Sequence, residues 1–272
     1  MALIQSQKDG HYFTFDDVKH KYTLDGEAVP GVTTFIKGGY PQSFNLTSWM
    51  IGQGASYTSK VLQRIGREKP LRIGDKLNEK IAKKSKTAYK KLSEEAAGIG
   101  SVVHDYAYLT EIERTSEAMQ MLSLHKETPQ WERIKNGVDK FEDWRKENKD
   151  ELVDSEQIVA SIQHSFGGKF DRLARRDGVL ILSDFKTSNG IYPDQFIQLA
   201  AYRLAIKEWL GLDVKMLEIL RFGKDDGDFH TLLIDKPSEI EMFTEQAIRC
   251  RQTYQFRKVE SDKRFKFGGK NV

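Results

Sequence analysis

Two short apolar runs of this sequence end in charged residues whose types and spacing could do chemistry. Asp171 ends one run, and Asp184, Phe185 and Lys186 end the apolar run 179–183. Side chains alternate between the two faces of a β-strand, so Asp184 and Lys186 should share one face while Phe185 points to the other. If the two runs pair as strands, Asp171 approaches Asp184.

Two carboxylates this close would repel each other, and at the end of a buried strand they are costly unless a cation bridges them. Carboxylate oxygens suit Mg²⁺ or Mn²⁺ better than Zn²⁺. Lys186 would add a positive charge beside an attacking water or a phosphate oxygen. Each residue alone is weak evidence, because Asp-x-Lys is more often an ordinary ion pair.

Four further polar residues could join these charges. His104 lies in an expected helix and is either a nitrogen ligand or an ordinary core or surface histidine. Glu156 precedes an expected strand, where a surface position is the default. Gln198 and Tyr202 are four residues apart on one helix face, so they could bind a phosphate or sugar, or make a tertiary hydrogen bond.

The elements that must position these residues form an α/β pattern. Alternating residues with a turn at Asp25-Gly26 predict an N-terminal hairpin within 11–34. The runs 156–162, 167–175 and 179–186 predict consecutive antiparallel strands. Further strands are expected at 214–222 and 229–235, and helices at 47–66, 74–92, 99–114, 130–148, 193–209 and from 237 onward.

Charge is segregated along the 272 residues. Residues 60–91 carry 12 Lys and Arg against 3 Asp and Glu, and residues 246–272 carry 8 against 2, around an acidic centre. Basic flanks are typical either of solvated surfaces or of segments that bind a polyanion. In the second case, some of the central carboxylates would hold metal ions that contact the phosphate groups of that polyanion. The basic residues chosen as candidate DNA contacts are Lys60, Arg64, Lys83 and Lys84.

The composition excludes several classes of protein. No apolar run approaches the roughly 20 residues of a membrane helix. The single cysteine, Cys250, excludes an internal disulfide and a four-cysteine iron–sulfur cluster. We therefore expect a cytoplasmic protein, from a bacterium or a phage-infected cell, with no membrane partner.

The order of these motifs resembles the RecB-like branch of the PD-(D/E)XK nuclease superfamily. The N-terminal segment 20–34 is also similar to that of the mitochondrial genome maintenance exonucleases and their phage relatives. The motifs that carry the first resemblance are Gly100-x-x-x-His104, Glu156, Gly168-x-x-Asp171, Asp184-x-Lys186 and Gln198-x-x-x-Tyr202.

The resemblance implies a restriction-endonuclease-like core, a central mixed sheet flanked by helices, here with an N-terminal hairpin and a helical elaboration. It implies Mg²⁺ or Mn²⁺ as cofactor and Lys186 as the catalytic lysine, with Glu156 as an accessory group. The implied metal ligands are His104, Asp171, Asp184 and the backbone carbonyl of Phe185. Gln198 and Tyr202 would position the DNA strand.

We therefore expect a metal-dependent DNA exonuclease that acts on single-stranded ends in repair, recombination or replication, with a recombination or replication protein as a conceivable partner. Two alternatives stay open: an endonuclease or nuclease subunit of a repair assembly, and an inactive nucleic-acid-binding protein. We expect one nuclease domain over 1–272. Its parts would be a hairpin and basic substrate-gripping region at 1–95, a catalytic core at 96–245 and a basic helix and tail at 246–272.

Overall fold

A computed structural model describes residues 3–41, 44–66, 75–225 and 227–260. The chain divides into two compact units, one formed by residues 1–40 and 102–272 and the other by residues 41–101. The last twelve residues of the expected basic tail, 261–272, lie outside the described residues. The candidate chemistry from His104 to Tyr202 falls wholly within the first unit.

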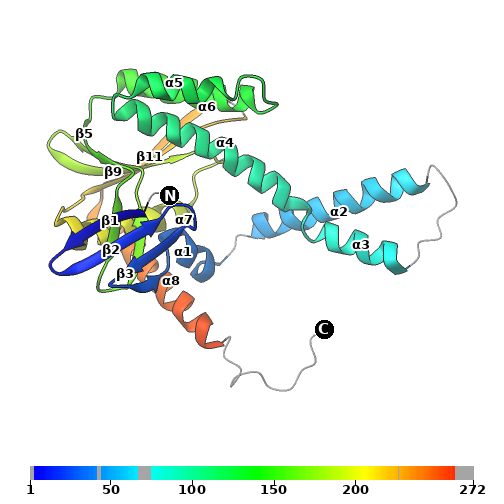
Figure 1. The fold of residues 1–272 in the computed structure, drawn as a ribbon, viewed down its shortest axis with the longest axis horizontal. Coiled ribbons are helices and arrows are strands. Elements are labelled where there is room, and N and C mark those ends of the chain that lie inside the picture. Colours follow the sequence, from blue (N-terminus) through cyan, green and yellow to red (C-terminus); the bar gives the residue numbers. More distant parts are fainter. Residues whose placement is uncertain (1–2, 42–43, 67–74, 226, 261–272) are drawn as a thin grey trace. The chain divides into compact units, whose positions relative to one another are not determined.

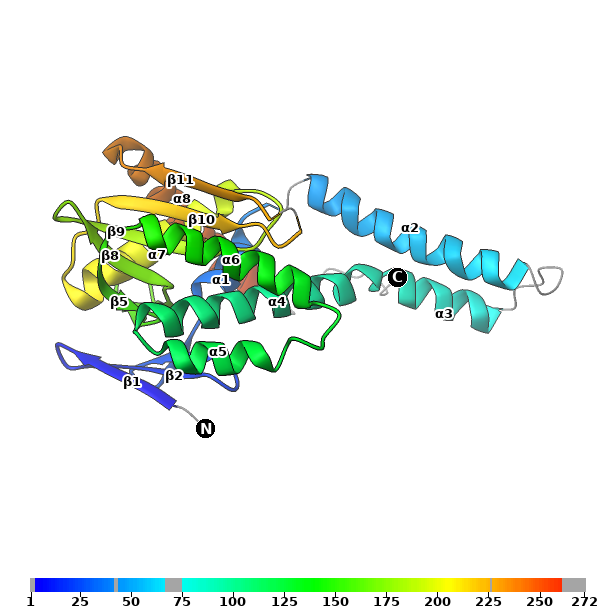
Figure 2. The ribbon, with the colours of Figure 1, turned by 90° about the horizontal axis from the view of Figure 1, so that it is seen from above.

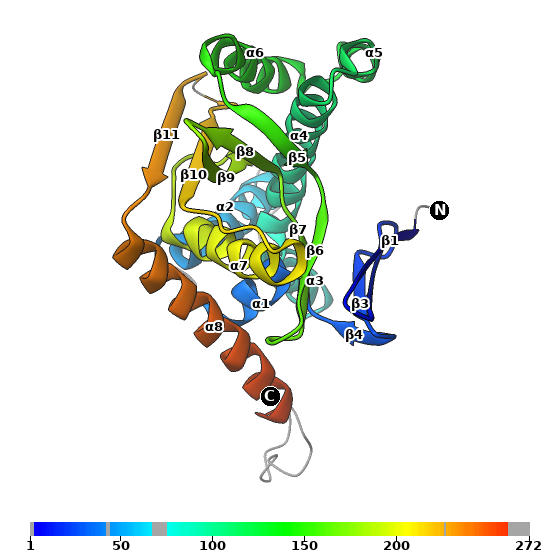
Figure 3. The same ribbon diagram turned by 90° about the vertical axis from the view of Figure 1, so that its left-hand side faces the viewer.

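A mixed sheet, which the family resemblance implies, forms the centre of the first unit and has five strands. Its strand order is β11-β10-β9-β8-β5, and β9 is parallel to β10 while the other neighbours are antiparallel. Helices lie on both faces of this sheet, with α7 on one side and α6 on the other (Figure 3). The strands are β5 (Glu151–Ser155), β8 (Arg172–Arg176), β9 (Val179–Lys186), β10 (Met216–Phe222) and β11 (Phe229–Ile234).

β9 is a nearly continuous apolar run because both of its faces are buried. Leu180 and Leu182 face the core that includes α7 (Pro193–Leu210). Phe185 points to the opposite face, where it packs against Phe141 and Trp144 of α6 (Trp131–Glu147). The alternation predicted for the end of this strand is therefore confirmed.

The N-terminal strands form a four-stranded antiparallel meander, drawn in blue in Figure 1. The predicted turn at Asp25-Gly26 joins the third and fourth strands, and the sequence patterns did not predict the first strand. Phe13 and Phe15 bury one face of the meander, and the Tyr22 ring stacks on both. The strands are β1 (Leu3–Lys8), β2 (His11–Asp16), β3 (Lys21–Leu24) and β4 (Glu27–Val29).

Two adjacent glycines let this meander and α7 approach a short separate hairpin, β6 (Ile158–Ser161) and β7 (Phe166–Lys169). A Cβ atom on Gly167 would lie 2.4 Å from the Phe13 ring, and one on Gly168 would lie 2.4 Å from the Tyr202 ring. Such distances are too short for any side chain. The two glycines that precede Asp171 in the chain are thus required by packing.

The three expected central strands are not one antiparallel series. The predicted strand 156–162 is β6 alone, with β5 ending just before it, and the predicted strand 167–175 divides into β7 and β8 at Phe170-Asp171. Glu156 has a φ of 55°, in the left-handed region that ends an extended strand. The chain therefore leaves the main sheet after β5 and returns to it at β8.

Helices α1 (Val32–Gly39) and α8 (Pro237–Glu260) pack together beside α7. Gly39 permits this contact, since a Cβ there would lie 2.1 Å from the Cys250 carbonyl oxygen. α8 begins at the expected Pro237. One further helix, α5 (Thr115–Ser123), has no counterpart in the sequence predictions.

The second unit contains α2 (Phe44–Gly66), α3 (Asp75–Ser85) and the first part of α4 (Ala88–Glu111). α2 and α3 run side by side (Figure 2), joined by a 2.5 Å hydrogen bond between the Thr58 and Ser85 hydroxyls. The boundaries of the predicted helices 74–92 and 99–114 are wrong. The first helix ends at Ser85, and α4 begins at Ala88 and continues through Gly98 and Gly100. None of the described helices has the length and apolar character needed to span a membrane.

Candidate active site

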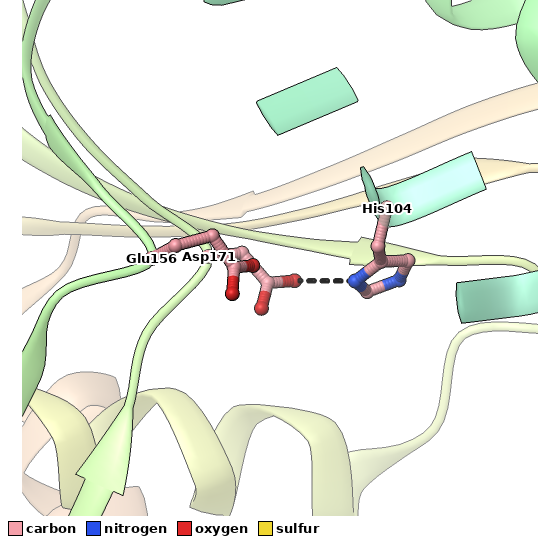
Figure 4. A group of neighbouring side chains, drawn as sticks. All are labelled: His104, Glu156 and Asp171. Carbon is pink, nitrogen blue, oxygen red and sulfur yellow. Dashed lines mark ion pairs between the residues drawn. The ribbon is translucent and has the colours of Figure 1, made fainter. Parts of the chain in front are cut away.

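His104 and Asp171 come from distant parts of the sequence and meet where β8 begins and β9 ends, at two interior strands of the central sheet. His104 is on α4, and its Nδ1 lies 3.4 Å from Asp171 Oδ2 (Figure 4). The same Asp171 oxygen accepts a 2.8 Å hydrogen bond from the Phe185 amide. Asp171 is therefore fixed against the end of β9, as the sequence predicts.

A buried ion pair positions the helix that carries His104. Arg172, directly after Asp171, donates from Nε to Glu111 Oε2 at 2.7 Å and from Nη1 to Asp150 Oδ2 at 3.2 Å. Its side chain is 1% exposed, and its guanidinium lies over the Trp144 ring. Because Glu111 is the last residue of α4, this contact ties the end of that helix to the strand that follows Asp171.

Glu156 completes a group of possible ligands with His104 and Asp171. One ligand atom from each of the three side chains lies within 4.8 Å of the others, as Figure 4 shows. The Glu156 amide donates to the Asp171 carbonyl at 3.1 Å, which holds its left-handed backbone conformation in place. The family resemblance implies an accessory role for Glu156, and the structure puts its carboxylate within this group.

Asp184 and Lys186 lie beside this group on the same face of β9. Asp184 is 1% exposed, and its Oδ2 forms an ion pair with Lys186 Nζ. Gln198 Nε2 donates to Asp184 Oδ1 and to the Tyr202 hydroxyl, each at 3.3 Å. Gln198 therefore contacts the acidic end of β9 directly, and the Tyr202 hydroxyl is linked to it through Gln198.

The candidate DNA contacts Lys60, Arg64, Lys83 and Lys84 are exposed and belong to the second unit. They are on α2 and α3. The other candidate residues from the sequence are brought together in the first unit.

Burial and the repulsion between neighbouring carboxylates raise the pKa values of the site carboxyl groups above their usual values. Burial raises the pKa of Glu156 to about 7, and the nearby Asp171 adds to this rise. Burial also raises the pKa of Asp184 to about 6, and the Lys186 ammonium offsets part of the effect. The pKa of Asp171 is raised by burial as well. A cation at these oxygens would relieve the cost of their negative charge.

The remaining site groups have settled protonation states at neutral pH. Burial, reinforced by Lys186, lowers the pKa of His104 to about 4, so its imidazole is neutral and can donate a lone pair. Burial alone would lower the pKa of Lys186, but Asp184 and Asp171 raise it overall, so its ammonium is charged. Burial raises the pKa of Tyr202 well above its usual value, which keeps the phenol protonated.

This donor set fits a divalent cation that prefers oxygen ligands. Two carboxylates and a neutral imidazole form the half-buried ligand group, the buried Asp184 lies beside it, and burial raises the pKa of both Glu156 and Asp184. Phe185 lies at the same cluster, because its amide donates to Asp171 and its ring meets the His104 ring edge-on, with 6.0 Å between the centroids. Glu156, His104 and Asp171 would hold the ion, with Asp184 beside them.

A sequence model of the PD-(D/E)XK nuclease superfamily matches residues 61–260. The chain belongs to this superfamily. The matched region contains the candidate residues of the first unit, from His104 to Tyr202.

A solved structure titled "Crystal structure of SSO0001" is 16% identical, over 55% of this chain and 74% of that chain, with a TM-score of 0.29. A search of curated proteins found no match.

Two residues at the site were not predicted from the sequence. Lys169, at the end of β7, forms an ion pair with Glu156. Tyr22 of β3 lies close enough for Glu156 to help burial raise its pKa to about 12. Lys169 stands between Gly168 and Asp171 of a quoted motif, which is a usable signal, whereas only the tertiary packing of the meander shows the place of Tyr22.

Proposed function

We propose that this protein is a metal-dependent deoxyribonuclease that hydrolyses phosphodiester bonds at the site formed by β9, α4 and α7. The observation that carries the proposal is the ligand group of His104, Glu156 and Asp171 beside the buried Asp184–Lys186 pair. The superfamily supports a hydrolytic nuclease and DNA as its substrate. Mg²⁺ or Mn²⁺ is the expected ion, because carboxylate oxygens dominate the donor set.

The residues of this chain have distinct parts in that reaction. When bound, the divalent cation would stabilise negative charge on the phosphate and acidify a bound water. Lys186 Nζ, kept charged by Asp184, would donate a hydrogen bond to the attacking water or to a phosphate oxygen. Gln198 would orient the Asp184 carboxylate through its Oδ1 atom.

We further propose exonuclease action on single-stranded DNA ends and membership of the RecB-like branch. The motif order from Gly100 to Tyr202 supports the branch. The exposed basic residues of α2 and α3 support binding of a strand through its phosphates. Such binding would weaken as salt is raised.

The experiment compares end-labelled linear single strands with closed single-stranded circles, in Mg²⁺ and in Mn²⁺. An exonuclease degrades the linear strand and leaves the circle intact. Cutting of both substrates at similar rates would replace exonuclease with endonuclease in this proposal. Cutting of neither, with DNA binding retained, would favour the inactive binding protein.

A further inference from the structure

Lys169 is a second lysine at the site, placed differently from Lys186. It is the last residue of β7, and its Nζ forms an ion pair with Glu156 Oε2. Its side chain is 33% exposed, whereas that of Lys186 is 20% exposed and is paired with the buried Asp184. Lys169 therefore contacts the ligand group through Glu156 and is also partly exposed to solvent, where a substrate can reach it.

The Glu156 carboxylate can take part in two interactions that compete with each other. One is the ion pair with Lys169, and the other is the ligand group with His104 and Asp171. A carboxylate that donates an oxygen to a divalent cation has less negative charge left for a neighbouring ammonium. A cation in the ligand group would therefore weaken the hold of Glu156 on Lys169.

Other carboxylates keep Lys169 at this position after that change. Asp17, Asp105 and Asp171 lie close enough to act on it electrostatically. Asp171 belongs to the same ligand group, while Asp17 and Asp105 are exposed. The ammonium would thus stay at the site, with part of its charge available to an anion.

We propose that Lys169 binds a phosphate of the DNA strand, and that it becomes available for this when a divalent cation engages Glu156. This inference rests on the proposed nuclease function and adds a substrate contact to that site. Metal and DNA then strengthen each other's binding, by equal factors in both directions. The rival account is a permanent Lys169–Glu156 pair that only neutralises charge.

DNA affinity separates the two accounts without any readout of cleavage. Fluorescence anisotropy of a labelled single-stranded oligonucleotide would be recorded over a range of salt, in Mg²⁺ and in EDTA. Every protein would carry Lys186→Ala, so that the oligonucleotide survives. Lys169→Gln removes the charge and Lys169→Arg retains it. Lys215→Gln is the matched control, because Lys215 is also a lysine in an ion pair, with Asp213.

In Mg²⁺ we expect Lys169→Gln to bind DNA about tenfold more weakly than the parent, which is the loss of one charge-assisted contact. The slope of log affinity against log salt should fall by about 0.7, the value for one phosphate on a single strand. Lys169→Arg should restore both values. In EDTA the variants should bind alike, and Lys215→Gln should match the parent in both conditions.

Equal DNA affinity of Lys169→Gln and the parent in Mg²⁺ would overturn the inference, and so would an equal loss in Mg²⁺ and EDTA. The first result would mean that Lys169 and Glu156 stay paired, and the second would mean that Lys169 contacts a phosphate whether or not metal is bound. Neither result would contradict the proposed nuclease function. That function fails separately, if the protein with Lys186 intact degrades no DNA in Mg²⁺ or Mn²⁺.

Discussion

Replacing Glu156 with Gln should stabilise the metal-free protein at alkaline pH, although it removes an ion pair. The folded protein raises the pKa of this carboxyl from 4.5 to about 7 even with Lys169 beside it. A tenfold change in proton affinity corresponds to about 1.4 kcal/mol, so the charged carboxylate costs the folded state about 3 kcal/mol. Gln has the same shape and carries no charge.

The sign of the pH dependence follows from the two pKa values. Below pH 4.5 the carboxyl is protonated in both the folded and unfolded states, so it costs the wild type nothing. As the pH rises toward 7, the unfolded chain releases the proton while the folded protein keeps it. The wild type therefore loses stability relative to Glu156→Gln across this window, and the full difference remains at higher pH.

The assay is thermal unfolding in EDTA at about pH 5 and about pH 8, since the second value lies above the raised pKa. The expected gain for Glu156→Gln at the higher pH is about 6–12 °C, from 2–4 °C per kcal/mol in a chain of this size. Glu239→Gln is the control, because Glu239 also pairs with a lysine, Lys236, but on an exposed helix surface. A variant no more stable than the wild type at the higher pH would refute this reasoning.

Three other outcomes follow from the same geometry. Gly168→Ala should lower the free energy of unfolding in urea by about 1–3 kcal/mol, because its Cβ would meet the Tyr202 ring. Phe185→Ala should lower it by about 3–5 kcal/mol, since that ring is 2% exposed among aromatic neighbours. Metal affinity by titration calorimetry should rise with pH through the raised pKa values of Asp184 and Glu156, about 6 and about 7, with protons released on binding. An unchanged free energy of unfolding would contradict the prediction for that substitution, and a metal affinity that does not depend on pH would contradict the third prediction.

The local patterns of the sequence were enough to predict much of the catalytic strand. The run from Val179 to Lys186 has no Gly or Pro and is rich in β-branched and apolar residues, so its extent and the alternation at its end were correct. Pro193 likewise marked the start of α7. These features depend on a few consecutive residues, which is why one sequence suffices to predict them.

Features set by tertiary contacts were not predictable in this way. Glu156 occupies a left-handed conformation that no local signal demands, and its place among the ligands comes from the hydrogen bond between its amide and the Asp171 carbonyl. The split of 167–175 into two strands of different sheets follows from the packing of Gly167 and Gly168 against the meander and α7. The ion pair of Lys169 required both of those arrangements to be known.

The most direct test of the central claim is the degradation of single-stranded oligonucleotides labelled at the 5′ or the 3′ end, in Mg²⁺, Mn²⁺ and EDTA, beside Lys186→Ala. The account predicts that label is lost in the metals, is retained in EDTA and is retained by the folded Lys186→Ala protein. Cleavage that persists in EDTA, or in Lys186→Ala with metal present, would contradict a metal-dependent nuclease centred on His104, Glu156, Asp171 and Lys186.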